Sequence, residues 1–187
     1  LGLQHLEIAA KESHYSWIEA SNVLTYSYLH IERDYIKAEK VISPLVDQFP
    51  GHPYFSFLTG ELLAKTGNWY ELALIMPRLE AFAASGPFLQ QNECQLKLAY
   101  IQALKAFHHK DYATAIDKCS WMLNNYHMEF DWLKGFAHIL RGQSYDMIET
   151  QDLAIDDYRE VLKMDDYYPE VAEAKERIDE RRNRGVK

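Results

Sequence analysis

Histidine and cysteine are the residue types in this chain that offer metal ligands and nucleophiles. Eight histidines are spread over 187 residues, and no two of them lie four residues apart. Zinc sites on helices use a His-Glu-x-x-His pattern, which places both ligands on one face. His108 and His109 are adjacent, so on a helix their side chains point about 100° apart. The sequence therefore predicts no metal site.

The spacing of the side chains does not indicate a nucleophilic site either. Cys94 and Cys119 form neither a Cys-x-x-Cys pair nor a disulfide framework, so we expect reduced, partly buried helix residues. Cys119 and a distant histidine are a nucleophile pair in principle, but nothing in the sequence brings them together. No phosphate-binding glycine loop and no nucleophile elbow occurs. The pairs Asp156-Asp157 and Asp165-Asp166 are expected to be solvated, so we predict no enzyme and no cofactor.

The charge of the chain bears on its partners. The formal net charge is -8, and the basic residues gather only near the C-terminus, at Arg181, Arg182, Arg184 and Lys187. Nucleic-acid binders usually carry a basic face, so no nucleic-acid partner is predicted. An end-of-helix cluster also suits the helix dipole, and a basic tail for an acidic partner is the alternative.

Neither a membrane span nor a compartment is indicated. No run of about 18 apolar residues occurs, so no transmembrane helix is predicted. Gln4, His5 and Glu7 interrupt the first ten residues, which therefore do not form the apolar core of a signal peptide. The missing initiator methionine suggests a mature product or a fragment, and both a cytoplasmic location and export after signal removal stay open.

Four segments of the chain share one pattern. The first position of the pattern is occupied in turn by Tyr26, Gly60, Ala103 and Gly142. The second position is occupied by Ala38, Leu72, Ala115 and Ala154. The two positions are 12 residues apart in every segment, whereas successive segments are 34, 43 and 39 residues apart. A fixed inner spacing with a variable outer one predicts rigid helical hairpins joined by links of different length.

The turn within each hairpin also recurs. It reads Asp34-Tyr35, Asn68-Trp69, Asp111-Tyr112 and Thr150-Gln151. Asp, Asn and Thr side chains cap helix N-termini by accepting a backbone N–H, and the aromatic residue that follows can fold back onto its own hairpin. Gln151 departs from this pattern, so the last hairpin is expected to pack differently at that corner.

This pattern resembles the tetratricopeptide repeat family, whose unit is a helix–turn–helix of about 34 residues. The matching residues are Gly60, Gly142 and Tyr145, the Asp-Tyr turns, Ala38, Ala115 and Ala154, and Pro50 at the end of a unit. Tyr26 and Leu72 depart from the family's preference for small residues, and two links exceed its period. The resemblance implies an all-α, right-handed superhelical array of antiparallel helix pairs.

The domain organisation follows from this register. Residues 16–165 are expected to form four hairpins, and residues 1–15 the second helix of a truncated upstream repeat. Residues 166–187 are dense in charge, and repeat arrays need a terminal element with a polar outer face. We therefore expect a C-terminal capping helix there.

The resemblance implies a concave groove lined by the first helix of each pair. In the present register the groove residues are Tyr54, Phe57, Glu61, Lys97, Tyr100, Leu104, Phe107, Phe136 and Gln143. Exposed aromatic residues supply much of the energy at interfaces. Internal packing of these rings is the alternative and stays open for each residue. Chaperone-binding relatives hold a carboxylate in a basic groove, but Val23, Phe57 and Tyr100 occupy such places here, so we expect a partner held mainly by apolar contact.

Three hypotheses about function remain. The first is an interaction scaffold that binds a peptide or helix of a partner protein in this groove. The second is a non-catalytic regulatory or targeting segment of a larger enzyme, assembly or envelope protein. The third is a homo-oligomerisation unit whose groove another copy fills.

Overall fold

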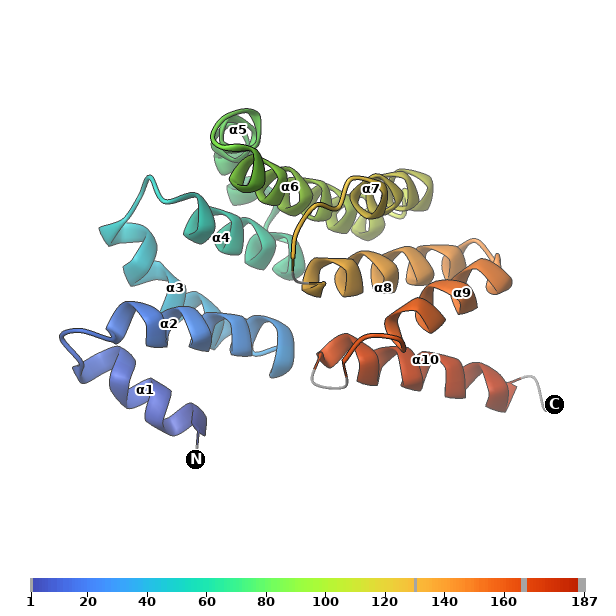
Figure 1. Cartoon of the computed structure of the whole chain (residues 1–187), viewed down its shortest axis with the longest axis horizontal. Coiled ribbons are helices and arrows are strands. Elements are labelled where there is room, and N and C mark those ends of the chain that lie inside the picture. Colours follow the sequence, from blue (N-terminus) through green and yellow to red (C-terminus); the bar gives the residue numbers. More distant parts are fainter. Residues whose placement is uncertain (1, 130, 166–167, 185–187) are drawn as a thin grey trace. The chain divides into compact units, whose positions relative to one another are not determined.

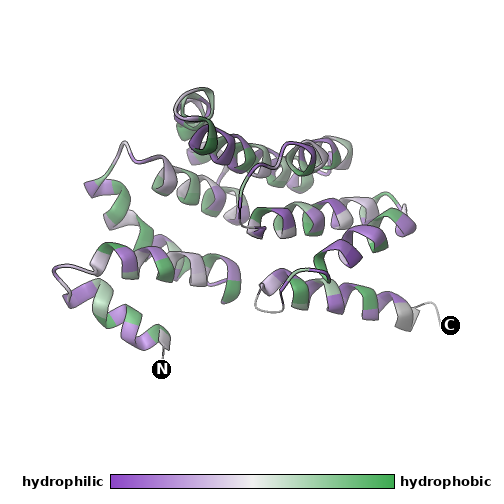
Figure 2. Cartoon of the chain, viewed as in Figure 1, coloured by the Kyte–Doolittle hydropathy of each residue, from purple (hydrophilic) through white to green (hydrophobic). Residues whose placement is uncertain are grey.

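The computed structural model describes residues 2–129, 131–165 and 168–184, with side chains up to residue 181. These residues form helices and no β-strand, which confirms the all-α prediction for the described part of the chain (Figure 1). The chain divides into two compact units, Leu1–Leu79 and Glu80–Lys187. Polar and apolar residues alternate along the helices, as expected for amphipathic helices that bury one face (Figure 2).

The first unit contains helices α1 to α4 and most of α5. Their bounds are α1 Gly2–Glu12, α2 Trp17–Tyr26, the π-helical turn η1 Ser27–Ile31, α3 Tyr35–Gln48, α4 Pro53–Thr66 and α5 Trp69–Ala84. Helix α2 packs against α1 and α3, and α3 packs against α4. The core between them includes Leu24, Leu29, Ile42, Leu45 and Phe55. Consecutive helices from α1 to α4 are therefore neighbours in space.

The second unit contains α6 to α10. Their bounds are α6 Phe88–His108, α7 Tyr112–Asn124, α8 Trp132–Met147, α9 Gln151–Val161 and α10 Pro169–Arg184. Each helix packs against the next, and α8 also contacts both α6 and α10. The predicted capping segment is thus helical in its described part. The side chains of Arg182, Arg184 and Lys187 lie outside the described residues.

The repeated pattern falls on consecutive helices. The pairs of positions 12 residues apart lie on α2 and α3, α4 and α5, α6 and α7, and α8 and α9. Gly142 and Ala154 lie on the packed helices α8 and α9. A β-carbon on Gly142 would come within 2.6 Å of Cε1 of Tyr158, one helical turn beyond Ala154. Gly142 is therefore small because the Tyr158 ring occupies the space beside it.

The turns of the hairpins share one backbone conformation. A residue with φ of +54 to +73° stands immediately before each predicted N-cap: Arg33, Gly67, Lys110 and Glu149. Three of these are not glycine, although the left-handed region favours glycine. A backbone N–H then donates to the carbonyl five residues earlier, from Asn68, Asp111 and Thr150, each at 2.9 Å. This bond satisfies a carbonyl at the end of the preceding helix.

The predicted caps are confirmed in three of the four turns. Oδ1 of Asp34, Asn68 and Asp111 accepts the N–H three residues on, at 3.1, 3.4 and 3.1 Å. Thr150 stands at the N-cap of α9, but its side chain makes no capping bond. The ring of Tyr112 folds back onto Phe107 at 5.5 Å, whereas Gln151 is exposed. The last hairpin therefore differs at that corner, as its sequence predicts.

Candidate functional site

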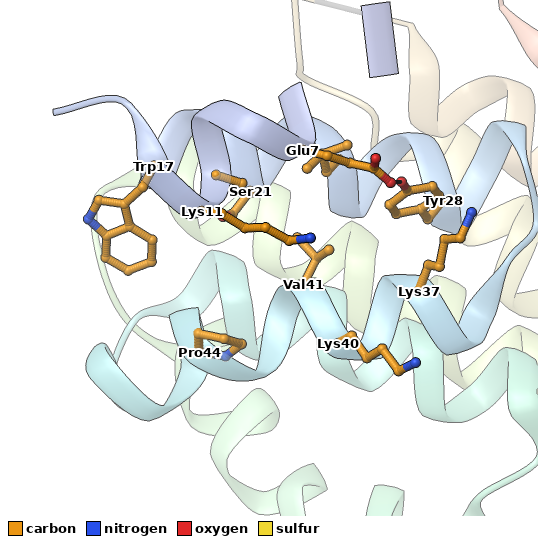
Figure 3. Close-up of a pocket in the computed structure, with 11 residues that line it drawn as sticks. Glu7, Lys11, Trp17, Ser21, Tyr28, Lys37, Lys40, Val41 and Pro44 are labelled. Carbon is orange, nitrogen blue, oxygen red and sulfur yellow. Dashed lines mark hydrogen bonds between the residues drawn. The ribbon is translucent and has the colours of Figure 1, made fainter. Parts of the chain in front are cut away.

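A pocket of about 290 Å³ lies between α1, α2 and α3 in the first unit (Figure 3). Its apolar lining consists of Ala10, Trp17, Leu24, Val41 and Pro44. Its polar lining consists of Glu7, Lys11, Ser21, Tyr28, Lys37 and Lys40. Ligand sites typically combine such an apolar wall with a few polar groups that fix orientation.

Helical spacing places these side chains together. Glu7, Ala10 and Lys11 follow the i, i+3, i+4 spacing of one helix face, and so do Lys37, Lys40 and Val41. Helix α2 lies between them and contributes Leu24 to the pocket. Helix α1 is held against this core because Leu3, Leu6 and Ala10 pack onto it. The pocket is therefore a product of the packing of three helices.

The polar end of the pocket contains an internal hydrogen bond. The hydroxyl of Tyr28 donates to Oε1 of Glu7 at 2.5 Å. Burial is the main cause that raises the pKa of Tyr28 to about 12, and the hydrogen bond to Glu7 is the second. The phenol is therefore a neutral donor near pH 7, and it engages the carboxylate of Glu7. Lys37 Nζ lies 5.2 Å from the centre of the Tyr28 ring and 3.5 Å from Asp34 Oδ2.

Two cations at the pocket have no such partner. Lys11 and Lys40 are exposed, and within the described part of the chain neither forms an ion pair. Figure 3 places Trp17 and Pro44 at one end of the pocket, Lys37 and Lys40 toward the other, and Lys11 across the middle. The pocket is therefore apolar at one end and cationic at the other.

The nine residues of the predicted groove divide between the two units, three in the first and six in the second. Phe57, Tyr100 and Phe136 are 2%, 6% and 4% exposed. The rings of Tyr100 and Phe136 stack at 5.4 Å within the core of the second unit. Leu104 and Phe107 are partly buried against the same core, as Tyr54 is against the core of the first unit. These aromatic rings pack inside the protein, which is the alternative to lining a groove that the sequence leaves open.

The polar members of the predicted groove have partners within their own units. Glu61 is 7% exposed and lies 3.3 Å from Lys65 Nζ and 3.6 Å from His30 Nδ1. Lys97 Nζ lies 2.5 Å from Glu93 Oε1 and 5.5 Å from the centre of the Trp132 ring. Gln143 donates to Glu173 at 2.7 Å.

A buried network in the second unit corrects one expectation. Asp157 is 3% exposed, whereas its neighbour Asp156 is solvated. Asp157 Oδ1 lies 2.7 Å from Nδ1 of His138 and 2.6 Å from Nη2 of Arg141, whose Nη1 donates to Ser120 at 3.0 Å. Adjacent residues point to different sides of a helix, so the solvation predicted for Asp157 is wrong.

The remaining candidates for chemistry are the two cysteines and the potential metal ligands. Cys94 and Cys119 are free and buried, and burial raises the pKa of Cys119 to about 12, so its thiol is protonated near pH 7. Among the residues described, no three His, Cys, Asp or Glu side chains are arranged to hold a metal ion. No helix in that same set is both long and apolar enough to cross a membrane.

Comparison of the chain with protein-family models, curated proteins and solved structures finds no match. The class of the protein therefore rests on its own geometry. From α1 to α4 and from α6 to α10, amphipathic helices pack in the order of the sequence. The first unit also carries a polarised pocket, which sequence reasoning missed. Three of the four lysines in residues 1–79 line this pocket. The sequence signal for the pocket is that these lysines lie at helical spacing from apolar residues.

Proposed function

We propose that this chain is a tetratricopeptide-like binding module, in which helix pairs form a right-handed array and the α1–α3 pocket receives a segment of a partner protein. Recurrence of the left-handed turn, the N-cap and the 12-residue spacing supports the repeat architecture. The main support for a binding function is the pocket, which has an apolar end and a cationic end.

The volume of the pocket lies at the lower end of the range for ligand sites. Sites that enclose a whole small molecule measure about 300–1,000 Å³, and this pocket has about 290 Å³. Such a volume suits one or two side chains of a larger partner. Interfaces concentrate their binding energy in anchor side chains that fill pockets of this kind.

The test uses a matched pair of substitutions on α3. Pro44 lines the pocket and is exposed, whereas Ser43 is exposed but does not line it. Pro44→Trp fills the pocket and Ser43→Trp adds the same side chain beside it. Random peptides displayed on phage are selected on the unmodified chain and synthesised, and their affinity for all three proteins is measured by fluorescence anisotropy.

The expected result is a loss of affinity of about tenfold or more for Pro44→Trp, and little change for Ser43→Trp. Circular dichroism of each variant checks that the helices are retained. Peptides that bind all three proteins equally would show that the pocket is not the docking site.

A further inference from the structure

The charges around the pocket identify the chemical class of the segment it receives. We infer that this segment is acidic, with an Asp or Glu carboxylate next to an apolar side chain. The inference rests on the proposed function and adds the charge of the occupant. It concerns the pocket between α1, α2 and α3, which is distinct from the groove that the sequence predicts.

The chain compensates only part of the charge at the cationic end, because three lysines line the pocket and Glu7 is the one carboxylate among its lining residues. Among the nearby carboxylates, Glu7 is engaged by Tyr28 and Asp34 lies beside Lys37. Lys11 and Lys40 line the pocket from α1 and α3, and neither forms an ion pair within the described residues. A carboxylate that enters between them gains attraction from both sides.

The rest of the chain makes this concentration of lysines selective. The whole chain carries a net charge of -8, so an acidic partner is repelled by the molecule on average. Salt reduces the influence of distant exposed charges over about 8–10 Å, so the charges that line the pocket, three lysines and Glu7, contribute most to the local potential. A basic segment would meet three ammonium groups there, and a neutral segment would leave Lys11 and Lys40 without an ion pair.

The apolar end fixes the second half of the motif. Trp17, Val41 and Pro44 can receive a leucine-sized or aromatic side chain, and Lys11 lies between this end and the cationic end. A peptide with an Asp or Glu one or two positions from an apolar residue can place its carboxylate at the cationic end and its apolar side chain at the apolar end. The pocket therefore selects an acidic–apolar sequence and not acidity alone.

The test compares two double variants of equal charge. Lys11→Gln with Lys40→Gln removes two ammonium groups at the pocket, whereas Lys105→Gln with Lys110→Gln removes two exposed ones in the second unit. Phage selection is repeated on the unmodified chain and on both variants. Selected peptides are also synthesised with Asp and Glu changed to Asn and Gln, and measured at about 0.05 M and about 0.5 M NaCl.

The unmodified chain and the Lys105/Lys110 variant should select acidic–apolar peptides, and the Lys11/Lys40 variant should not. For a given acidic peptide, loss of the two pocket lysines should weaken binding about threefold to tenfold, because exposed ion pairs contribute modestly. The Asn/Gln peptides should bind more weakly, and with less dependence on salt.

Other outcomes separate the two proposals. Peptides that lose binding to Pro44→Trp but show no preference for acidic residues would overturn the acidic occupant and leave the binding function intact. An absence of any peptide sensitive to Pro44→Trp would overturn both. Calorimetry with sodium decanoate tests a free amphiphile, and binding of decanoate without any selected peptide would overturn the protein partner.

Discussion

Cationic side chains at one site in each unit differ in whether they form ion pairs. In the second unit, Arg141 is bound to Asp157 within a buried network, and Lys97 is paired with Glu93. In the first unit, Lys11 and Lys40 stand beside a pocket and form no ion pair within the described residues. Both units are built from similar helix pairs, so the difference lies in the side chains and not in the scaffold. Cations that the fold has already paired stabilise it, and those left at a pocket are available to a partner.

A second pocket, in the second unit, can be compared directly with the first. It has about 430 Å³ and is lined by Gln95, Leu98, Ala99, Gln102, Asp117, Lys118 and Trp121 of α6 and α7. Because Ala103 corresponds to Tyr26, residues 77 apart occupy equivalent positions. Lys40 and Pro44 of the first pocket then correspond to Asp117 and Trp121 of the second. The repeat sets where a pocket forms, and the lining residues decide what it attracts.

The largest effect is expected from the paired cation. Asp157→Ala leaves Arg141 without its carboxylate in a largely buried site, which should lower the free energy of unfolding by about 3 kcal/mol. Asp156→Ala is the control, since Asp156 is solvated, and it should change stability by less than about 0.5 kcal/mol. Urea unfolding followed by circular dichroism measures both. Equal stability of the two variants would mean that the network is not structural.

A smaller effect is expected at the crossing of α8 and α9. Gly142→Ala places a β-carbon 2.6 Å from the fully buried ring of Tyr158, which should cost about 1–3 kcal/mol. The gain in helix propensity from glycine to alanine is about 1 kcal/mol, so the expected net loss of stability is about 0–2 kcal/mol. Gly51→Ala is the control, because nothing lies within 4 Å of its added carbon.

The first unit contains two positions equivalent to Gly142: Gly60 stands at one, and the other provides a contrast. Tyr26 stands there, at the end of α2 and just before the π-helical turn η1. Thermal unfolding of Gly142→Ala and Tyr26→Gly tests the contrast, since each variant should be less stable than the unmodified chain. A stabilised Gly142→Ala would contradict the close contact with Tyr158.

The elements of the fold were predictable because their signals are local. The N-cap residues and the 12-residue spacing act within one hairpin, and they place the helix pairs where the structure has them. The positive φ of the turn residues Arg33, Lys110 and Glu149 was not predictable, because none of them is glycine. Their conformation is imposed by the backbone bonds that close the turn.

The site was less predictable because it depends on contacts between helices. Amphipathic spacing marks Phe57, Tyr100 and Phe136 as facing one side, but a helix packed on two sides buries more than one face. Their burial therefore could not be read from the sequence. The pocket combines Glu7 and Lys11 with Lys40, which meet only because α1 and α3 both pack on α2.

The smallest effect is expected from the hydrogen bond at the polar end of the pocket. Tyr28→Phe removes the donor to Glu7, and the free energy of unfolding should fall by about 0.5–1.5 kcal/mol near pH 7. Tyr15→Phe is the control, because Tyr15 is 93% exposed. Unfolding in urea measures both.

The pH dependence of stability tests the same bond more specifically. Burial, with help from Glu7, raises the pKa of Tyr28 from 10.0 to about 12, so the unfolded chain loses this proton first as the pH rises. The stabilisation is fully present below pH 10 and is lost between pH 10 and about 12. Tyr158 of the second unit, which donates to Asp146, has its pKa raised to about 12 in the same way, mainly by burial. Each of Tyr28→Phe and Tyr158→Phe should therefore lose less stability than the unmodified chain between these pH values. If only Tyr158→Phe does so, the hydroxyl of Tyr28 is solvated at the pocket and the polar end is more open than its contact with Glu7 indicates.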